Sequence, residues 1–91
     1  MNTDKHETAV ALAGRAKRIL EDDMVVAAFD RLEKEFTDRW RKSGVDDRDG
    51  REEAFRYLKV VERFRQHFER LIEDGKLAES ALEQLRRKLS R

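Results

Sequence analysis

Apolar residues recur every three or four positions along almost the whole chain, which is the spacing of one face of an α-helix. Proline is absent and only four glycines occur, so few residues would interrupt helices. Charged residues make up 45% of the chain and hydrophobic residues 38%, a balance that disordered proteins also show. The regular apolar spacing and the intermixed charge signs argue against disorder. We therefore expect an all-α protein whose helices each have one apolar stripe and a broad charged face.

Glycines and capping residues divide this pattern into four expected helices. Gly44 is expected in the left-handed conformation just after the second helix, and Gly75 at the end of the third. Between the first and second helices the sequence allows either a true interruption or only a kink. Acidic residues are the expected N-caps: Asp4 with Glu7 as its capping-box partner, Asp22 or Asp23, and Asp49 with Glu52. The expected helices span residues 4–21, 23–43, 50–74 and 76–90.

A polar loop, residues 44–50, joins the second and third helices, and a connection this short makes them antiparallel neighbours. The predicted fold is an antiparallel helical hairpin with shorter flanking N- and C-terminal helices, a three- to four-helix bundle within a single helical domain, residues 1–91. No internal repeat stands out. Most aromatic residues fit the hairpin core, namely Phe29, Phe36, Tyr57, Phe64 and Phe68.

Residues that could support catalysis or bind a cofactor are largely missing. Without cysteine the chain has no disulfides and no thiolate metal site. The loop resembles a calcium-binding loop, but Val45 and Arg56 occupy positions where oxygen ligands are required. His6 and His67 each lack the glutamate three residues earlier that a helical di-iron site needs. Small all-helical chorismate mutases remain an alternative, although they need a much longer first helix. We expect no enzymatic activity, no cofactor, no metal and no small-molecule substrate.

Nucleic-acid binding is an alternative with some support. The C-terminal residues Arg86, Arg87, Lys88 and Arg91 form a basic cluster that could contact phosphates. Basic residues in a last helical turn also stabilise the helix dipole, which explains them without any ligand. The net charge of +1 gives no general attraction to nucleic acid. A protein partner or self-association is therefore the leading prediction, and nucleic acid the second.

The expected partner-binding residues are apolar side chains at the ends of the predicted helices. Trp40 and Phe55 flank the loop, where exposed aromatic residues would resemble interface hot spots. Leu82, Leu85 and Leu89 form an aliphatic stripe near the C-terminus that needs a partner surface.

Several short sequence motifs occur along the chain in a characteristic order. They are Arg15-Ala16-x-x-Ile19-Leu20-x-Asp22, Ala28-Phe29, Glu35, Trp40, Asp49-x-Arg51-Glu52 and Gly75-Lys76-x-Ala78. In this order the sequence resembles small all-helical proteins encoded by tailed bacteriophages and prophages near virion-assembly genes. The resemblance implies a structural role in the virion or its assembly. The alternative is a small regulatory protein that binds nucleic acid or a host protein through its basic terminal segments.

Two features bear on where the protein acts. The longest apolar run, residues 24–29, is too short to cross a bilayer. The first eight residues lack the hydrophobic stretch of a signal peptide. We expect a cytoplasmic protein without a membrane partner, in the host cytoplasm if a phage encodes it, with incorporation in the virion as an alternative.

Overall fold

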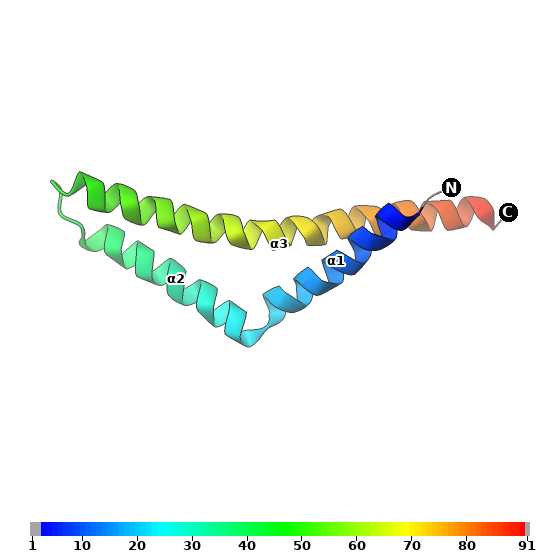
Figure 1. Cartoon of the computed structure of the whole chain (residues 1–91), viewed down its shortest axis with the longest axis horizontal. Coiled ribbons are helices and arrows are strands. Elements are labelled where there is room, and N and C mark those ends of the chain that lie inside the picture. Colours follow the sequence, from blue (N-terminus) through cyan, green and yellow to red (C-terminus); the bar gives the residue numbers. More distant parts are fainter. Residues whose placement is uncertain (1–2, 91) are drawn as a thin grey trace. The chain divides into compact units, whose positions relative to one another are not determined.

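The computed structural model describes residues 3–90. Within this range the chain is all-α, as predicted, with no strand and with three helices instead of four (Figure 1). These helices are α1 (Asp4–Glu21), α2 (Asp23–Lys42) and α3 (Arg48–Leu89).

The break between α1 and α2 is a true interruption. Asp22 has φ −68° and ψ 125°, an extended conformation that ends one helix before the next begins. Its carboxylate accepts hydrogen bonds from the backbone N–H groups of Met24, at 2.9 Å, and Val25, at 3.3 Å. Asp22 is therefore the N-cap of α2, and Asp23 is the first helical residue.

α1 spans the predicted residues 4–21, but its N-terminal cap lies one residue before the predicted cap, Asp4. The Thr3 carbonyl accepts the first helical bond, from the Glu7 N–H at 3.0 Å, and the Thr3 hydroxyl donates to Glu7 Oε1 at 2.8 Å. Asp4 lies inside the helix, where its negative charge suits the positive end of the helix dipole. Glu7 thus belongs to the N-terminal cap, but its partner is Thr3 and not Asp4.

Ser43, not a left-handed glycine, ends α2. Its backbone is extended, its N–H donates to the Arg39 carbonyl at 3.0 Å, and its hydroxyl donates to the Trp40 carbonyl at 2.5 Å. The prediction for Gly44 was wrong, because no described glycine has a positive φ. A serine that binds the last carbonyls itself removes the need for a left-handed residue.

α3 begins two residues earlier than predicted, because Asp47 and not Asp49 caps it. The Asp47 carboxylate accepts from the Gly50 N–H at 3.0 Å, and its carbonyl accepts from the Arg51 N–H at 3.1 Å. The expected capping box of Asp49 with Glu52 is therefore wrong. The Glu52 carboxylate instead pairs with Arg48 at 3.2 Å and Arg56 at 3.6 Å.

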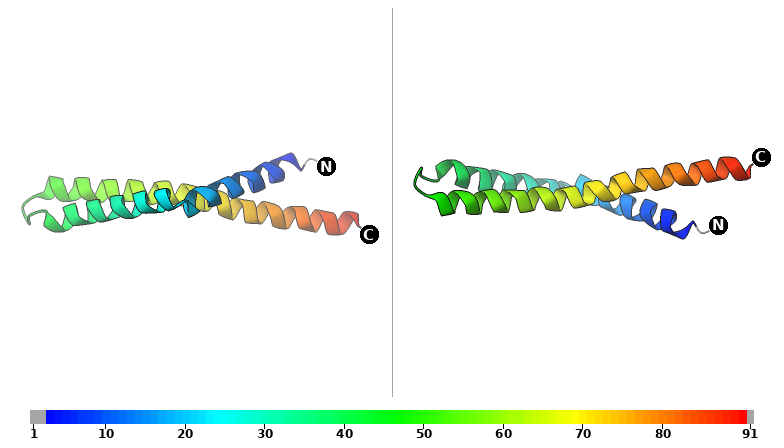
Figure 2. Two further views of the ribbon diagram at one scale, coloured as in Figure 1. Left: turned by 90° about the horizontal axis from the view of Figure 1, so that it is seen from below. Right: turned by 90° about the horizontal axis from the view of Figure 1, so that it is seen from above.

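α3 is one helix of 42 residues, and the predicted division into 50–74 and 76–90 was wrong. Both views in Figure 2 show it uninterrupted. Gly75 lies in its interior and is buried. A Cβ atom added there would overlap the Cβ of Ala13 and lie 3.2 Å from the carbonyl oxygen of Ala9. Gly75 therefore provides space for α1, and does not stop α3.

The chain forms two compact units, and α3 contributes to both. Unit 1 comprises Met1–Leu20 and His67–Arg91, and unit 2 comprises Glu21–Gln66. In unit 1, α1 packs on the C-terminal part of α3 through Ala13 and Gly75. In unit 2, α2 packs on the N-terminal part of α3, where the ring centroids of Phe36 and Tyr57 lie 5.2 Å apart and those of Phe29 and Phe64 6.0 Å apart.

Few side chains are buried in either unit. Among residues 3–90, three of the buried hydrophobic residues are alanines, and the only large ones are Phe29 and Val61. Tyr57 and Phe64, predicted to lie in the core, are 44% and 59% exposed. The reason is that a pair of helices covers only one side of each apolar stripe. The buried hydrophobic residues are Ala16, Phe29, Ala54, Val61 and Ala78.

Candidate docking surface

α3 carries a seven-residue repeat in which every first and fourth position, a and d, is apolar or glycine. Such a repeat is the signature of a helix that packs lengthwise against others. The spacing of seven is readable in the sequence. The a and d residues are Gly50, Ala54, Tyr57, Val61, Phe64, Phe68, Leu71, Gly75, Ala78, Leu82, Leu85 and Leu89.

In unit 2 the stripe packs against a matching stripe on α2, with Phe29 and Phe36 at a positions and Val25 and Leu32 at d positions. The two helices run in opposite directions, because Phe36 contacts Tyr57 whereas the earlier Phe29 contacts the later Phe64. In an antiparallel pair, the e positions of both helices lie along one edge and the g positions along the other. The two edges of unit 2 are chemically different.

Ion pairs cover the e edge. Arg65 Nη1 lies 2.7 Å from Glu33 Oε1, Arg65 Nη2 lies 3.9 Å from Asp30, and the guanidinium stacks 4.9 Å from the centroid of the Phe29 ring. The Glu33 oxygen is buried and makes no well-aligned hydrogen bond, so the short ion pair with Arg65 is what compensates its charge. We call this side the closed edge.

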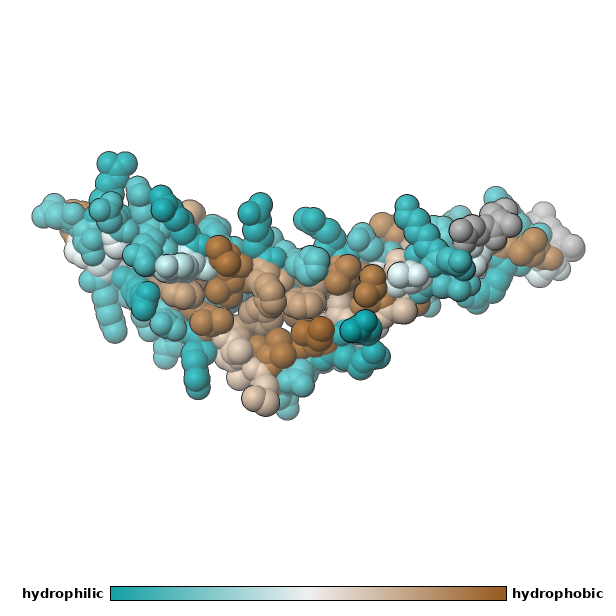
Figure 3. Space-filling model, in the orientation of Figure 1, coloured by the Kyte–Doolittle hydropathy of each residue, from teal (hydrophilic) through white to brown (hydrophobic). Residues whose placement is uncertain are grey.

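Apolar side chains cover the opposite edge, which we call the open edge and define by Leu32, Tyr57, Val60 and Phe64. These side chains are 37%, 44%, 62% and 59% exposed. Ala28, the g residue of α2, is also exposed and continues the same strip. Figure 3 shows apolar side chains gathered over α2 and α3 on the face that it presents. The open edge is therefore an exposed apolar strip along unit 2.

Trp40 and Phe55, the predicted anchors, come together beside the loop. They are 51% and 53% exposed and line one shallow pocket of about 450 Å³. Charged residues surround them, and one of these, Arg51, donates to the Val45 carbonyl at 2.6 Å and so holds the loop. The other charged residues lining this pocket are Glu52 and Arg56.

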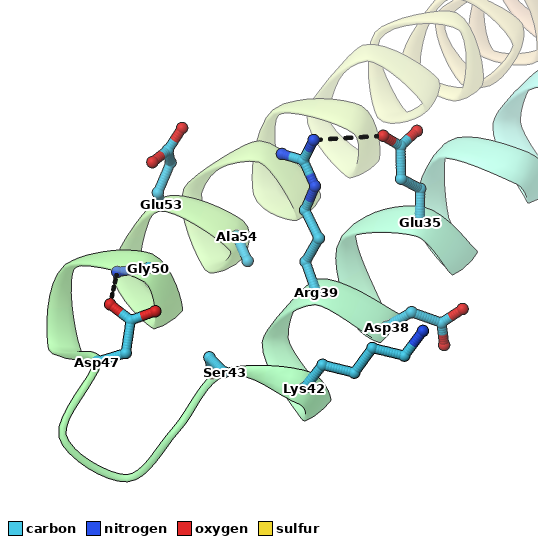
Figure 4. Close-up of a pocket in the computed structure, with 9 residues that line it drawn as sticks. All are labelled: Glu35, Asp38, Arg39, Lys42, Ser43, Asp47, Gly50, Glu53 and Ala54. Carbon is cyan, nitrogen blue, oxygen red and sulfur yellow. Dashed lines mark hydrogen bonds and ion pairs between the residues drawn. The ribbon is translucent and has the colours of Figure 1, made fainter.

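A second pocket of about 570 Å³ lies at the loop end of unit 2 (Figure 4). Arg39 and Glu35 pair there at 3.6 Å, and Lys42 and Glu53 also line it. Two further acidic residues, Asp38 and Asp47, also line it, so four carboxylates and two basic side chains surround this pocket. Within residues 3–90 no three potential ligands are grouped so that they could hold a metal ion.

The C-terminal residues predicted to bind a partner lie in the last turns of α3. Leu82 and Leu85 are half-buried, whereas Leu89 is 76% exposed. The predicted phosphate-contacting side chains are exposed as well, and Arg87 pairs with Glu83 at 2.9 Å. Arg91 lies outside the described residues. Of the predicted phosphate-contacting residues, those described are Arg86, Arg87 and Lys88.

Within residues 3–90, none of the three helices combines the length and apolar character that crossing a bilayer requires.

Comparison with known proteins adds no further constraint on the site. The sequence matches no protein-family model, it is not similar to any curated protein, and no solved structure matches the fold.

Proposed function

We propose that this chain is a non-enzymatic structural protein that works by associating with other protein chains, and with copies of itself in particular. The observation that carries the proposal is the open edge of unit 2, a strip of large apolar side chains that the fold leaves uncovered. Monomeric proteins rarely expose such strips unless a partner binds them.

In this proposal unit 2 is the antiparallel helical hairpin expected from the sequence. It provides a rigid body, and α1 packs on the C-terminal part of α3 in unit 1. Trp40, Phe55 and the C-terminal leucines offer further apolar contacts to an assembly. The resemblance to phage-encoded helical proteins supports a role as a virion or assembly component, made in the host cytoplasm.

Light scattering over a range of protein concentrations tests this function. Self-association predicts a mass that rises from 10.8 kDa to a defined multiple as the concentration increases. The association should persist at high salt, because apolar contacts, unlike ion pairs, are not screened. A protein that stays monomeric at every concentration would refute self-association.

A small regulatory protein that binds nucleic acid or a host protein is the second candidate, and the exposed basic turn at the end of α3 favours it. Phosphate contacts predict retention of DNA that weakens steeply with salt. Neutralising Arg86, Arg87 and Lys88 together should then abolish the retention. If DNA is not retained at low salt, this candidate is excluded.

A further inference from the structure

We infer that the open edge of unit 2 is a homodimer interface, in which Leu32, Tyr57, Val60 and Phe64 pack against the same residues of a second copy. This inference rests on the proposed function and assigns it a surface. It concerns residues other than Trp40, Phe55 and the C-terminal leucines, which the sequence singled out.

The first support is the small core of unit 2. Within residues 21–66, Phe29 and Val61 are the only large buried side chains. Short chains with so little core commonly gain their stability by associating. A second copy is present wherever the chain is made, so it can cover the edge every time the chain folds.

The second support is area. A fully exposed aromatic side chain has an accessible area of about 150–250 Å². Scaled by the exposed fractions, the open edge together with the neighbouring Met24, 83% exposed, presents roughly 500 Å² of accessible area in each chain. Two chains would bury about 1,000 Å², which reaches the size that separates specific interfaces from incidental contacts.

The third support is charge. Both signs occur at the loop end of the open edge, where Glu35 and Lys42 of α2 and Glu53 of α3 line one pocket. A border with mixed signs can form ion pairs with its own copy, whereas a border of one sign would repel it. The closed edge cannot serve in the same way, because Arg65 and Glu33 already pair across it.

Sedimentation equilibrium of three variants tests the inference. Val60→Glu places a charge in the strip and should weaken dimerisation at least about a hundredfold, since each dimer contains the change twice. Val60→Ala removes apolar area while favouring the helix, and should weaken dimerisation by about tenfold or more. Leu77→Glu is the matched control, because Leu77 is a similarly exposed apolar residue of α3, 66% against 62%, that lies in unit 1. It should leave the dimer intact.

Circular dichroism keeps the result interpretable if Val60→Glu unfolds. Val60→Ala should retain the helical signal, and the melting temperature of the unmodified protein should rise with concentration, as it does for a dimer that unfolds on dissociation. A dimer that resists both Val60 substitutions would overturn this surface and leave the proposed function standing. A monomer at every concentration would overturn both.

Discussion

Replacing Gly75 by alanine tests the packing of unit 1, because close packing determines whether the substitution raises or lowers the free energy of unfolding. In an exposed helix interior, alanine stabilises relative to glycine by about 1 kcal/mol. At Gly75 the new methyl group would overlap the Cβ of Ala13 and approach the carbonyl oxygen of Ala9 at 3.2 Å. Neither atom is the end of a flexible side chain, so α1 would have to move, and overpacking of this kind costs about 1–3 kcal/mol. The two effects together leave Gly75→Ala up to about 2 kcal/mol less stable than the unmodified protein.

Gly14 in α1 provides the matched control, since the nearest atom to a Cβ added there is Arg18 Nη1 at 3.9 Å. Gly14→Ala should therefore raise the free energy of unfolding by about 1 kcal/mol. Urea titrations followed by circular dichroism would measure both variants, and their difference, about 1–3 kcal/mol, isolates the contact with α1. Ala13→Gly should restore stability to Gly75→Ala, because it removes the overlapping methyl group. Equal stabilisation by the two glycine substitutions would refute the close approach of α1 to α3.

Three further tests concern the N-cap of α2, the ion pair between Arg65 and Glu33, and the exposure of Trp40. Asp22→Ala should lower the free energy of unfolding by about 1 kcal/mol because α2 loses its N-cap, whereas Asp22→Asn should retain most of it; an equal loss in both would contradict the capping role. Arg65→Met should lower the free energy of unfolding by about 1 kcal/mol. A double-mutant cycle with Glu33→Gln should give a coupling energy of about 0.5–1 kcal/mol, more than that of the surface pair Lys59 and Glu62. A coupling energy of zero would mean that this pair does not hold the closed edge. Trp40, 51% exposed, should emit near the wavelength of solvated tryptophan and be quenched by acrylamide, in the dimer as well as in the monomer; a strongly blue-shifted emission would show that it is buried.

The helices were predictable from the sequence because periodicity is a property of many residues at once. Their ends were less predictable, since each end depends on which of several capping residues the backbone uses. Asp47 and Asp49 are equally good N-caps by residue type, and only the path of the loop selects Asp47. The division at Gly75 failed for a related reason. A glycine followed by polar residues predicts a helix end, but a glycine is also what a close helix crossing requires, and the partner, Ala13, lies more than 60 residues away.

The candidate docking surface was likewise only partly predictable from the sequence. The seven-residue repeat of α3 marks which residues face a partner helix, and it could have been read from the sequence. It does not state how many helices share the stripe. Tyr57 and Phe64 satisfy the pattern of core residues, yet they are exposed, because α2 alone covers the stripe from one side in unit 2. The prediction that Trp40 and Phe55 lie near each other at the loop depended only on the connection between two helices, which is a local property.

Side-chain size explains why the two units bury their stripes differently. In unit 1 the stripe of α3 has small residues at Gly75 and Ala78, and α1 faces it with alanines. The two backbones therefore approach closely, and Ala16 and Ala78 are buried by this helix pair alone. In unit 2 the stripe contains Tyr57 and Phe64, whose rings contact Phe36 and Phe29 of α2 and yet are 44% and 59% exposed. The ion pair between Arg65 and Glu33 covers one edge of this helix pair, and the homodimer inferred above would cover the other.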